Sequence, residues 1–146
     1  MKLAIILTAC LFGTVFAQEG LPGGWNSLST DDSTVNQLAI KSVNHHNSVN
    51  NSAYYKKLVK IQEARYQVVA GFKYEIKFLI GKTECAKTGN YTDSCQVAVN
   101  SPTELCTYVF WMPPVDKDRI TSFDCVATNE DVLEKHLTIN CEVFIN

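Results

Sequence analysis

The sequence contains little of what catalytic and metal-binding proteins depend on. It has three histidines, no Cys-x-x-Cys pair, no Gly-x-Ser-x-Gly motif and no glycine-rich phosphate loop. On a helix, the adjacent His45 and His46 would point about 100° apart and would not ligate one metal ion from one face, so one surface and one half-buried histidine is the simpler interpretation. His136, alone in the second half, does not supply the Cys, His and Asn set of a cysteine protease. We therefore expect no enzyme, no metal and no cofactor.

A strong charge of one sign is also missing. Lys and Arg number 13 against 15 Asp and Glu, a balance that does not favour nucleic acid as a partner. One long apolar run, residues 3–11, opens the chain, but it is shorter than the ~20 residues of a membrane-spanning helix. With Lys2 before it and Val15-Phe16-Ala17 after it, this run predicts a signal peptide over residues 1–17 rather than a membrane anchor. The protein is therefore expected to be secreted and extracellular, with no membrane partner.

Cysteine is the residue type that the chain does hold in quantity. Six occur, and Cys10 falls within the predicted signal peptide. In a secreted chain, the remaining five predict a disulfide framework with one cysteine unpaired or intermolecular. Any four of them allow three pairings, and spacing alone does not choose among these.

The first half of the chain predicts a helix followed by a long hairpin. Asp31, Asp32 and Ser33 supply cap residues and negative charge, and apolar residues then recur at helical spacing, which predicts a helix over residues 33–49. Residues 72–80 carry a large apolar side chain at every even position, which is typical of a half-buried strand. Residues 54–66 and 72–82 are therefore predicted to pair, with residues 67–71 as the tip. Val68-Val69-Ala70 is unusually apolar for a turn and favours a partner that covers it.

The second half predicts a further hairpin. Residues 96–100 and 105–111 read as strands, and residues 119–126 as the returning strand. Met112-Pro113-Pro114 between them is predicted to be a turn, because proline has no N–H to give to a sheet.

The tip sequence Gln67-Val68-Val69-Ala70-Gly71 resembles the Gln-x-Val-x-Gly motif of the cystatins, protein inhibitors of papain-like cysteine proteases. The leader, the pair Gly23-Gly24, the hairpin and four spaced cysteines also follow in the order of that family, so the resemblance covers residues 21–125. It implies an α+β cystatin fold, a twisted antiparallel sheet wrapped around one long α-helix. The cystatin-like domain would span residues 18–126, leaving residues 127–146 as a C-terminal extension of unknown role.

The resemblance also selects a disulfide pairing. Secreted cystatins carry two consecutive disulfides, a shorter loop before a longer one, which here implies Cys85–Cys95 and Cys106–Cys125, at separations of 10 and 19 residues. Cys141 is then the unpaired cysteine. It is either buried in a monomer or the link of a disulfide-bonded dimer.

The function that the resemblance implies is reversible, competitive inhibition of papain-like proteases of the cathepsin L and B type. Gly23, residues 67–71 and a second hairpin tip would enter the active-site cleft. The family places Pro-Trp at that second tip. Counting from Cys106 puts Pro114-Val115 there, counting back from Cys125 puts Pro113-Pro114 there, and the tryptophan is missing on both counts. Trp111 lies earlier, in a predicted strand.

A different function is also open. Other secreted proteins use the cystatin fold as a binding module without protease inhibition, and fold does not fix function. The missing tryptophan, Pro22 before the glycine pair and the long C-terminal extension favour this alternative. The intact motif of residues 67–71 favours inhibition.

Two asparagine-containing segments carry further expectations. Asn50-Asn51-Ser52 follows the predicted helix, and Asn50 opens a glycosylation sequon. Asn51 falls on the position where some cystatins inhibit legumain, although polar residues leaving a helix explain it equally. Asn90-Tyr91-Thr92 is a second sequon, in a loop setting that suits a glycan better.

Overall fold

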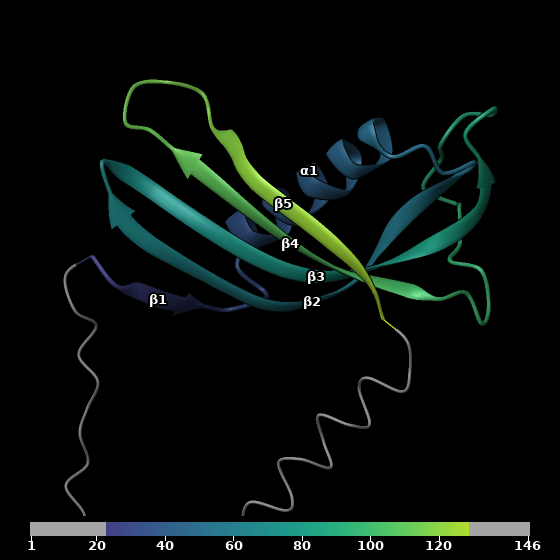
Figure 1. The fold of residues 1–146 in the computed structure, drawn as a ribbon, viewed down its shortest axis with the longest axis horizontal. Coiled ribbons are helices and arrows are strands. Elements are labelled where there is room, and N and C mark those ends of the chain that lie inside the picture. Colours follow the sequence, from purple (N-terminus) through teal and green to yellow (C-terminus); the bar gives the residue numbers. More distant parts are fainter. Residues whose placement is uncertain (1–22, 129–146) are drawn as a thin grey trace, which may run out of the picture.

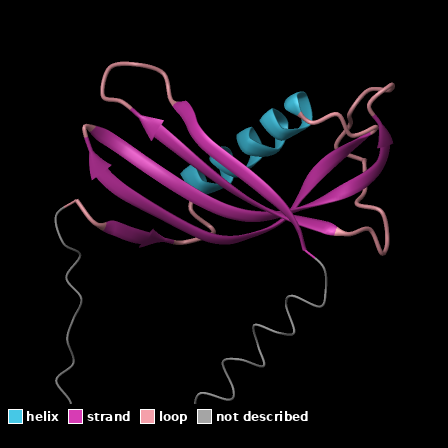
Figure 2. Cartoon of the chain, viewed as in Figure 1, coloured by secondary structure: helices cyan, strands magenta, loops and turns pink. Residues whose placement is uncertain are grey.

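The computed structural model describes residues 23–128 (Figure 1). Within that range it contains β1 (Trp25–Leu28), α1 (Ser33–Val49), β2 (Tyr54–Val69), β3 (Gly71–Ala86), β4 (Thr103–Met112) and β5 (Arg119–Thr128). The strands form one antiparallel sheet in the order β1-β2-β3-β4-β5, and α1 packs across one face of it (Figure 2). The expected α+β fold, a curved antiparallel sheet around a long helix, is confirmed.

Helix α1 begins and ends where the sequence predicts. Asp32 is its N-cap, and the carboxylate of Asp32 accepts the backbone N–H groups of Thr34 and Val35 at 2.8 and 3.2 Å. These bonds satisfy two of the donors that every helix leaves without partners in its first turn. Five side chains of the helix join His46 on the buried face: Val35, Leu38, Ala39, Ser42 and Val43. The burial of this face holds the helix on the sheet, since a helix of this length is marginal alone.

The core lies between α1 and the middle strands. Ile76, Phe78 and Ile80 of β3 are fully buried, which confirms the alternation seen in the sequence, and Tyr108 and Phe110 of β4 continue the layer. Each such side chain contributes roughly 1.5–3 kcal/mol on burial. Burial also raises the pKa of the Tyr108 hydroxyl to about 12.

Both predicted disulfides are present. Cys85 joins Cys95 across a loop, with 5.8 Å between the Cα atoms, and Cys106 joins Cys125 between directly paired residues of β4 and β5. The pairing implied by the resemblance is therefore confirmed. Cys141, the predicted signal peptide over residues 1–17 and almost all of the predicted C-terminal extension lie outside the described residues.

The prediction of a strand over residues 96–100 is wrong. That segment makes a single bridge, Thr83 to Val97, and the chain then turns at residues 99–100, with a φ of 59° at Asn100. The first hairpin is longer than predicted and its turn tighter, because β2 runs to Val69 and β3 starts at Gly71. Among the described residues, no helix has the length and apolar character needed to cross a membrane.

Candidate functional site

Three segments far apart in the sequence meet at one end of the sheet. Figure 1 shows the start of β1, the β2–β3 turn and the β4–β5 loop on the same side of the molecule, opposite the loop that follows α1. We call them the arm (Gly23), the first tip (residues 67–71) and the second tip (residues 113–115). They hold all the residues that the sequence assigns to protease binding.

The first tip is an exposed apolar turn with a fixed backbone. Only Ala70 lies between β2 and β3, and Gly71 adopts a φ of +89°. A Cβ at Gly71 would overlap the carbonyl oxygen of Met112, so glycine is required both for its backbone angle and for the close approach of β4. Val68 and Val69 remain 53% and 42% exposed. An apolar surface thus stands at the end of a rigid hairpin.

The arm is tied to the first tip. The side-chain amide of Gln67 donates to the Gly23 carbonyl at 2.6 Å, beside the β1–β2 ladder in which Trp25 pairs with Gln67. Gly23 has a φ of +83°, and a Cβ there would meet nothing within 4 Å. Its backbone is therefore open to a partner, and Leu21 and Pro22 before it lie outside the described residues.

The second tip stands beside the first. Pro113 is half-buried, Pro114 is exposed and Val115 is 97% exposed, the highest value among the large apolar residues that the structure describes as exposed. Trp111 lies in β4, as predicted, but its indole N–H reaches across and donates to the Ala70 carbonyl at 2.9 Å. The two tips are thus connected by this side chain as well as by the β3–β4 ladder.

The asparagines after α1 lie at the opposite end of the sheet. Asn51 is exposed, whereas the side chain of Asn50 is engaged: its oxygen accepts the Ser52 N–H at 2.7 Å and its nitrogen lies 3.0 Å from Nε2 of His46. Lys87 donates to the carbonyl oxygen of Asn50 at 2.6 Å and fixes the loop further. Asn90 is exposed in the loop closed by Cys85–Cys95.

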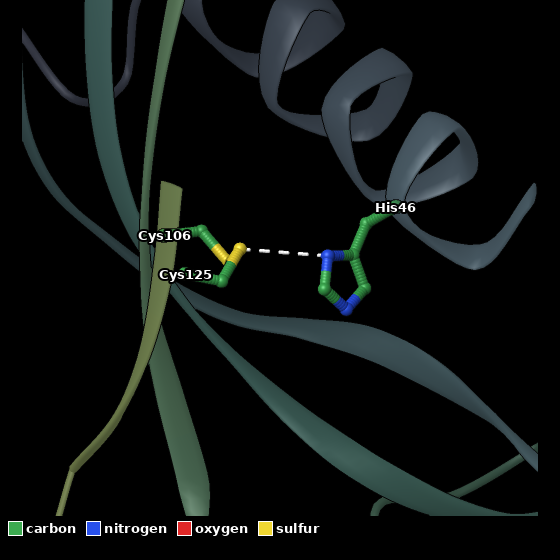
Figure 3. Close-up of side chains that lie close together, drawn as sticks. All are labelled: His46, Cys106 and Cys125. Atoms are coloured by element: carbon green, nitrogen blue, oxygen red, sulfur yellow. Dashed lines mark hydrogen bonds between the residues drawn. A yellow bond between two sulfur atoms is a disulfide. The ribbon is translucent and has the colours of Figure 1, made fainter. Parts of the chain in front are cut away.

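His46 is buried and His45 is half-buried, so both histidines are less exposed than the expected pair of one surface and one half-buried histidine. The His45 ring is partly covered because it packs against Tyr108 and Phe123. Figure 3 shows the imidazole pointing at the Cys106–Cys125 disulfide, with Nδ1 3.4 Å from the Cys125 sulfur. Although the three side chains cluster, disulfide sulfurs are not the thiolates that bind zinc. Burial lowers the pKa of His46, and Lys56 lowers it further against the opposing effect of Glu104.

This geometry can be compared with that of known proteins. A family model described as "Cystatin domain" matches residues 23–114, more than half of the chain. The chain belongs to the cystatin family. Cystatins are of the cysteine protease inhibitor type rather than enzymes, so an inhibitor role in general follows for this chain.

Individual cystatins agree in sequence and structure. Cystatin-1 of Chilobrachys guangxiensis is 35% identical over 114 residues, covering 76% of this chain and 84% of that protein. The crystal structure of Al-CPI matches with a TM-score of 0.69 at 28% identity, covering 73% of this chain and 100% of the other. Dimeric human cystatin F matches with a TM-score of 0.64 at 27% identity, covering 79% and 95% of the two chains.

Two features of this cystatin were missed by sequence reasoning. Strand β1 was not predicted, because it is only four residues long and Trp25 and Leu28 are its only apolar residues. The bond from Trp111 to Ala70 joins residues 41 positions apart, and no local pattern reports such a contact. The one signal in the sequence is the position of Trp111, a side chain with an N–H donor two residues before Pro113.

Proposed function

We propose that this cystatin is a secreted, reversible and competitive inhibitor of papain-like cysteine proteases of the cathepsin L and B type. The observation that carries the proposal is the junction of the arm and both tips into one surface. Gln67 bonds the first tip to the arm at 2.6 Å, and Trp111 bonds it to the second hairpin at 2.9 Å. Three segments joined in this way form one surface that suits a cleft shaped for an extended peptide.

The mechanism is occlusion. Val68 and Val69 offer apolar area that a protease cleft would remove from water, at roughly 25 cal/mol per Å². Because the tip belongs to a long paired hairpin, little conformational entropy is lost on binding. Such a surface needs no nucleophile, and it offers no bond in position for cleavage, so inhibition is reversible.

The test is a titration of the secreted protein against papain and a cathepsin L-type enzyme with a fluorogenic substrate. The double variant Gln67→Ala, Val69→Asp removes the bond to the arm and places a charge in the apolar contact. We expect its inhibition constant to rise by about a hundredfold or more, the size of a hot-spot loss.

The matched control is Val99→Asp, because Val99 is 86% exposed and lies outside both tips. We expect this variant to inhibit like the wild type. If folded wild-type protein fails to inhibit at micromolar concentration, the alternative of a binding module without inhibition replaces the proposal.

A second activity is favoured by the position of Asn51. This residue is exposed on a loop that Asn50 and Lys87 hold in place, at the end of the molecule away from the tips. We propose that Asn51 is the contact residue for legumain, an asparagine-specific protease.

Asn51→Ala should abolish legumain inhibition and leave papain inhibition intact. Asn44→Ala, an exposed asparagine of α1, is the matched control, and equal legumain inhibition by both variants would contradict the assignment.

A further inference from the structure

Trp111 contacts the first tip at its apex. Ala70 is the one residue between β2 and β3, and its carbonyl accepts the Trp111 indole N–H at 2.9 Å. Trp111 belongs to β4, where it pairs with Lys73 in the strand ladder. A donor from the neighbouring strand therefore fixes the orientation of the apical peptide group, which the β2–β3 ladder ending at Val69 and Gly71 does not reach.

The indole ring is itself held from the other side. The guanidinium of Arg119, the first residue of β5, lies 5.5 Å from the Trp111 ring centre, and Arg119 forms an ion pair with Asp116. Cation–π contacts of this kind favour one ring orientation. The Trp111 indole N–H is thus positioned by β4 and β5 together. The orientation of the first tip therefore depends on the second hairpin.

We propose that Trp111 is a positioning residue for inhibition, which holds the first tip in its binding orientation through the Ala70 carbonyl. The inference rests on the proposed function and names how the first tip is held in place in a chain whose second tip lacks the family tryptophan. A tip that samples several orientations binds through only the competent fraction of them, and its apparent affinity falls by that fraction. Losing the indole N–H therefore slows association, whereas losing a direct contact with the protease would speed dissociation.

The test removes the indole N–H, with a smaller ring in one variant and the bicyclic ring kept in the other. Trp111→Phe is one variant, and site-specific replacement of the Trp111 indole by benzothiophene is a second, in which sulfur replaces N–H at nearly the same shape. We expect both to lower the association rate constant for papain by about fivefold, the worth of one neutral hydrogen bond, with dissociation unchanged. A role in packing alone would leave the benzothiophene protein unchanged.

The matched control is the same benzothiophene replacement at Trp25, because it keeps the ring that Arg65 contacts and, among the described residues, the Trp25 indole N–H has no hydrogen-bond partner. Its association rate constant should equal that of the wild type. Unchanged association by the benzothiophene protein, or a loss found only in dissociation, overturns the proposal while leaving the proposed function intact.

The free protein gives a readout that does not depend on inhibition. By ¹⁵N relaxation, the backbone order parameters of Ala70 and Gly71 should fall in both Trp111 variants and stay unchanged in the control with benzothiophene at Trp25. If the wild type does not inhibit, the proposed function fails and this measurement still decides whether Trp111 positions the tip. Unchanged order parameters would overturn the positioning role.

Discussion

Gly71→Ala is the substitution whose cost can be worked out most fully from the structure. Gly71 has a φ of +89°, and placing an L-residue with a Cβ in that region costs roughly 1–2 kcal/mol. The added Cβ would also overlap the backbone carbonyl of Met112, which cannot rotate away as a side chain would. Forcing β3 and β4 apart adds about 1–3 kcal/mol, as in other overpacked sites. The free energy of unfolding should therefore fall by about 2–5 kcal/mol.

Urea denaturation with both disulfides intact measures this loss, and inhibition of papain measures its effect on the first tip. We expect the inhibition constant of the Gly71→Ala protein to rise by about tenfold or more, because the tip is displaced from the second hairpin. Gly71→Asn separates the two causes: asparagine tolerates the backbone angle but carries the same Cβ. If the overlap with Met112 is the larger cause, the Gly71→Asn protein should lose nearly as much stability as the Gly71→Ala protein.

The matched control is Gly89→Ala. Gly89 does not have a positive φ, and the nearest atom to a Cβ there is 3.7 Å away, so its stability should change by less than about 1 kcal/mol. Wild-type stability and wild-type inhibition in Gly71→Ala would refute the account of the first tip.

Two further predictions concern the end of the molecule away from the tips. Because burial lowers the pKa of His46, its native state resists protonation, so stability is highest above the ordinary histidine pKa and is lost as the pH falls from that value through the lowered pKa of the native state. The urea midpoint should drop as the pH falls below the ordinary histidine pKa of about 6.5, and less steeply in His46→Gln; equal slopes would contradict this. We also expect a glycan on Asn90 and none on Asn50, because the oxygen and the nitrogen of the Asn50 side chain are already hydrogen-bonded. Asn90→Gln alone should therefore abolish the change in gel mobility that a peptide N-glycanase causes. A mobility change that survives in Asn90→Gln would contradict this.

Local signals were enough to predict most of the fold. The helix bounds followed from the cap at Asp32 and from 3.6-residue periodicity, and the buried face of β3 followed from strict alternation. The disulfides followed from the family resemblance rather than from the residues themselves.

The segment over residues 96–100 shows where local reasoning fails. Its alternating valines resemble a strand, but the edge of β3 from Phe72 to Gly81 is already occupied by β4. Only the end of β3 is left, and it accepts one bridge, at Val97. Val99 is consequently 86% exposed. An alternating pattern indicates that a segment can form a strand, whereas its pairing depends on which strand edge of the sheet is free.

The candidate site also has one part that the sequence predicts and another that it does not. The sequence predicts an apolar turn at residues 67–71, which stands out because most turns consist of polar residues, glycine and proline. The bonds that make it part of a larger surface, from Gln67 to Gly23 and from Trp111 to Ala70, join residues 44 and 41 positions apart. Contacts at that separation are created by the sheet register, which the sequence does not display.

The exposed valines allow the central claim to be measured directly. Cross-saturation from papain to methyl-labelled protein reports which valine side chains contact the enzyme. We expect saturation of Val68, Val69 and Val115, on the two tips, and none at Val49 or Val126, which are nearly as exposed as Val68 but lie elsewhere. Saturation at Val49 or Val126 without the tip valines, or at the first tip without Val115, would contradict a single surface made of both tips.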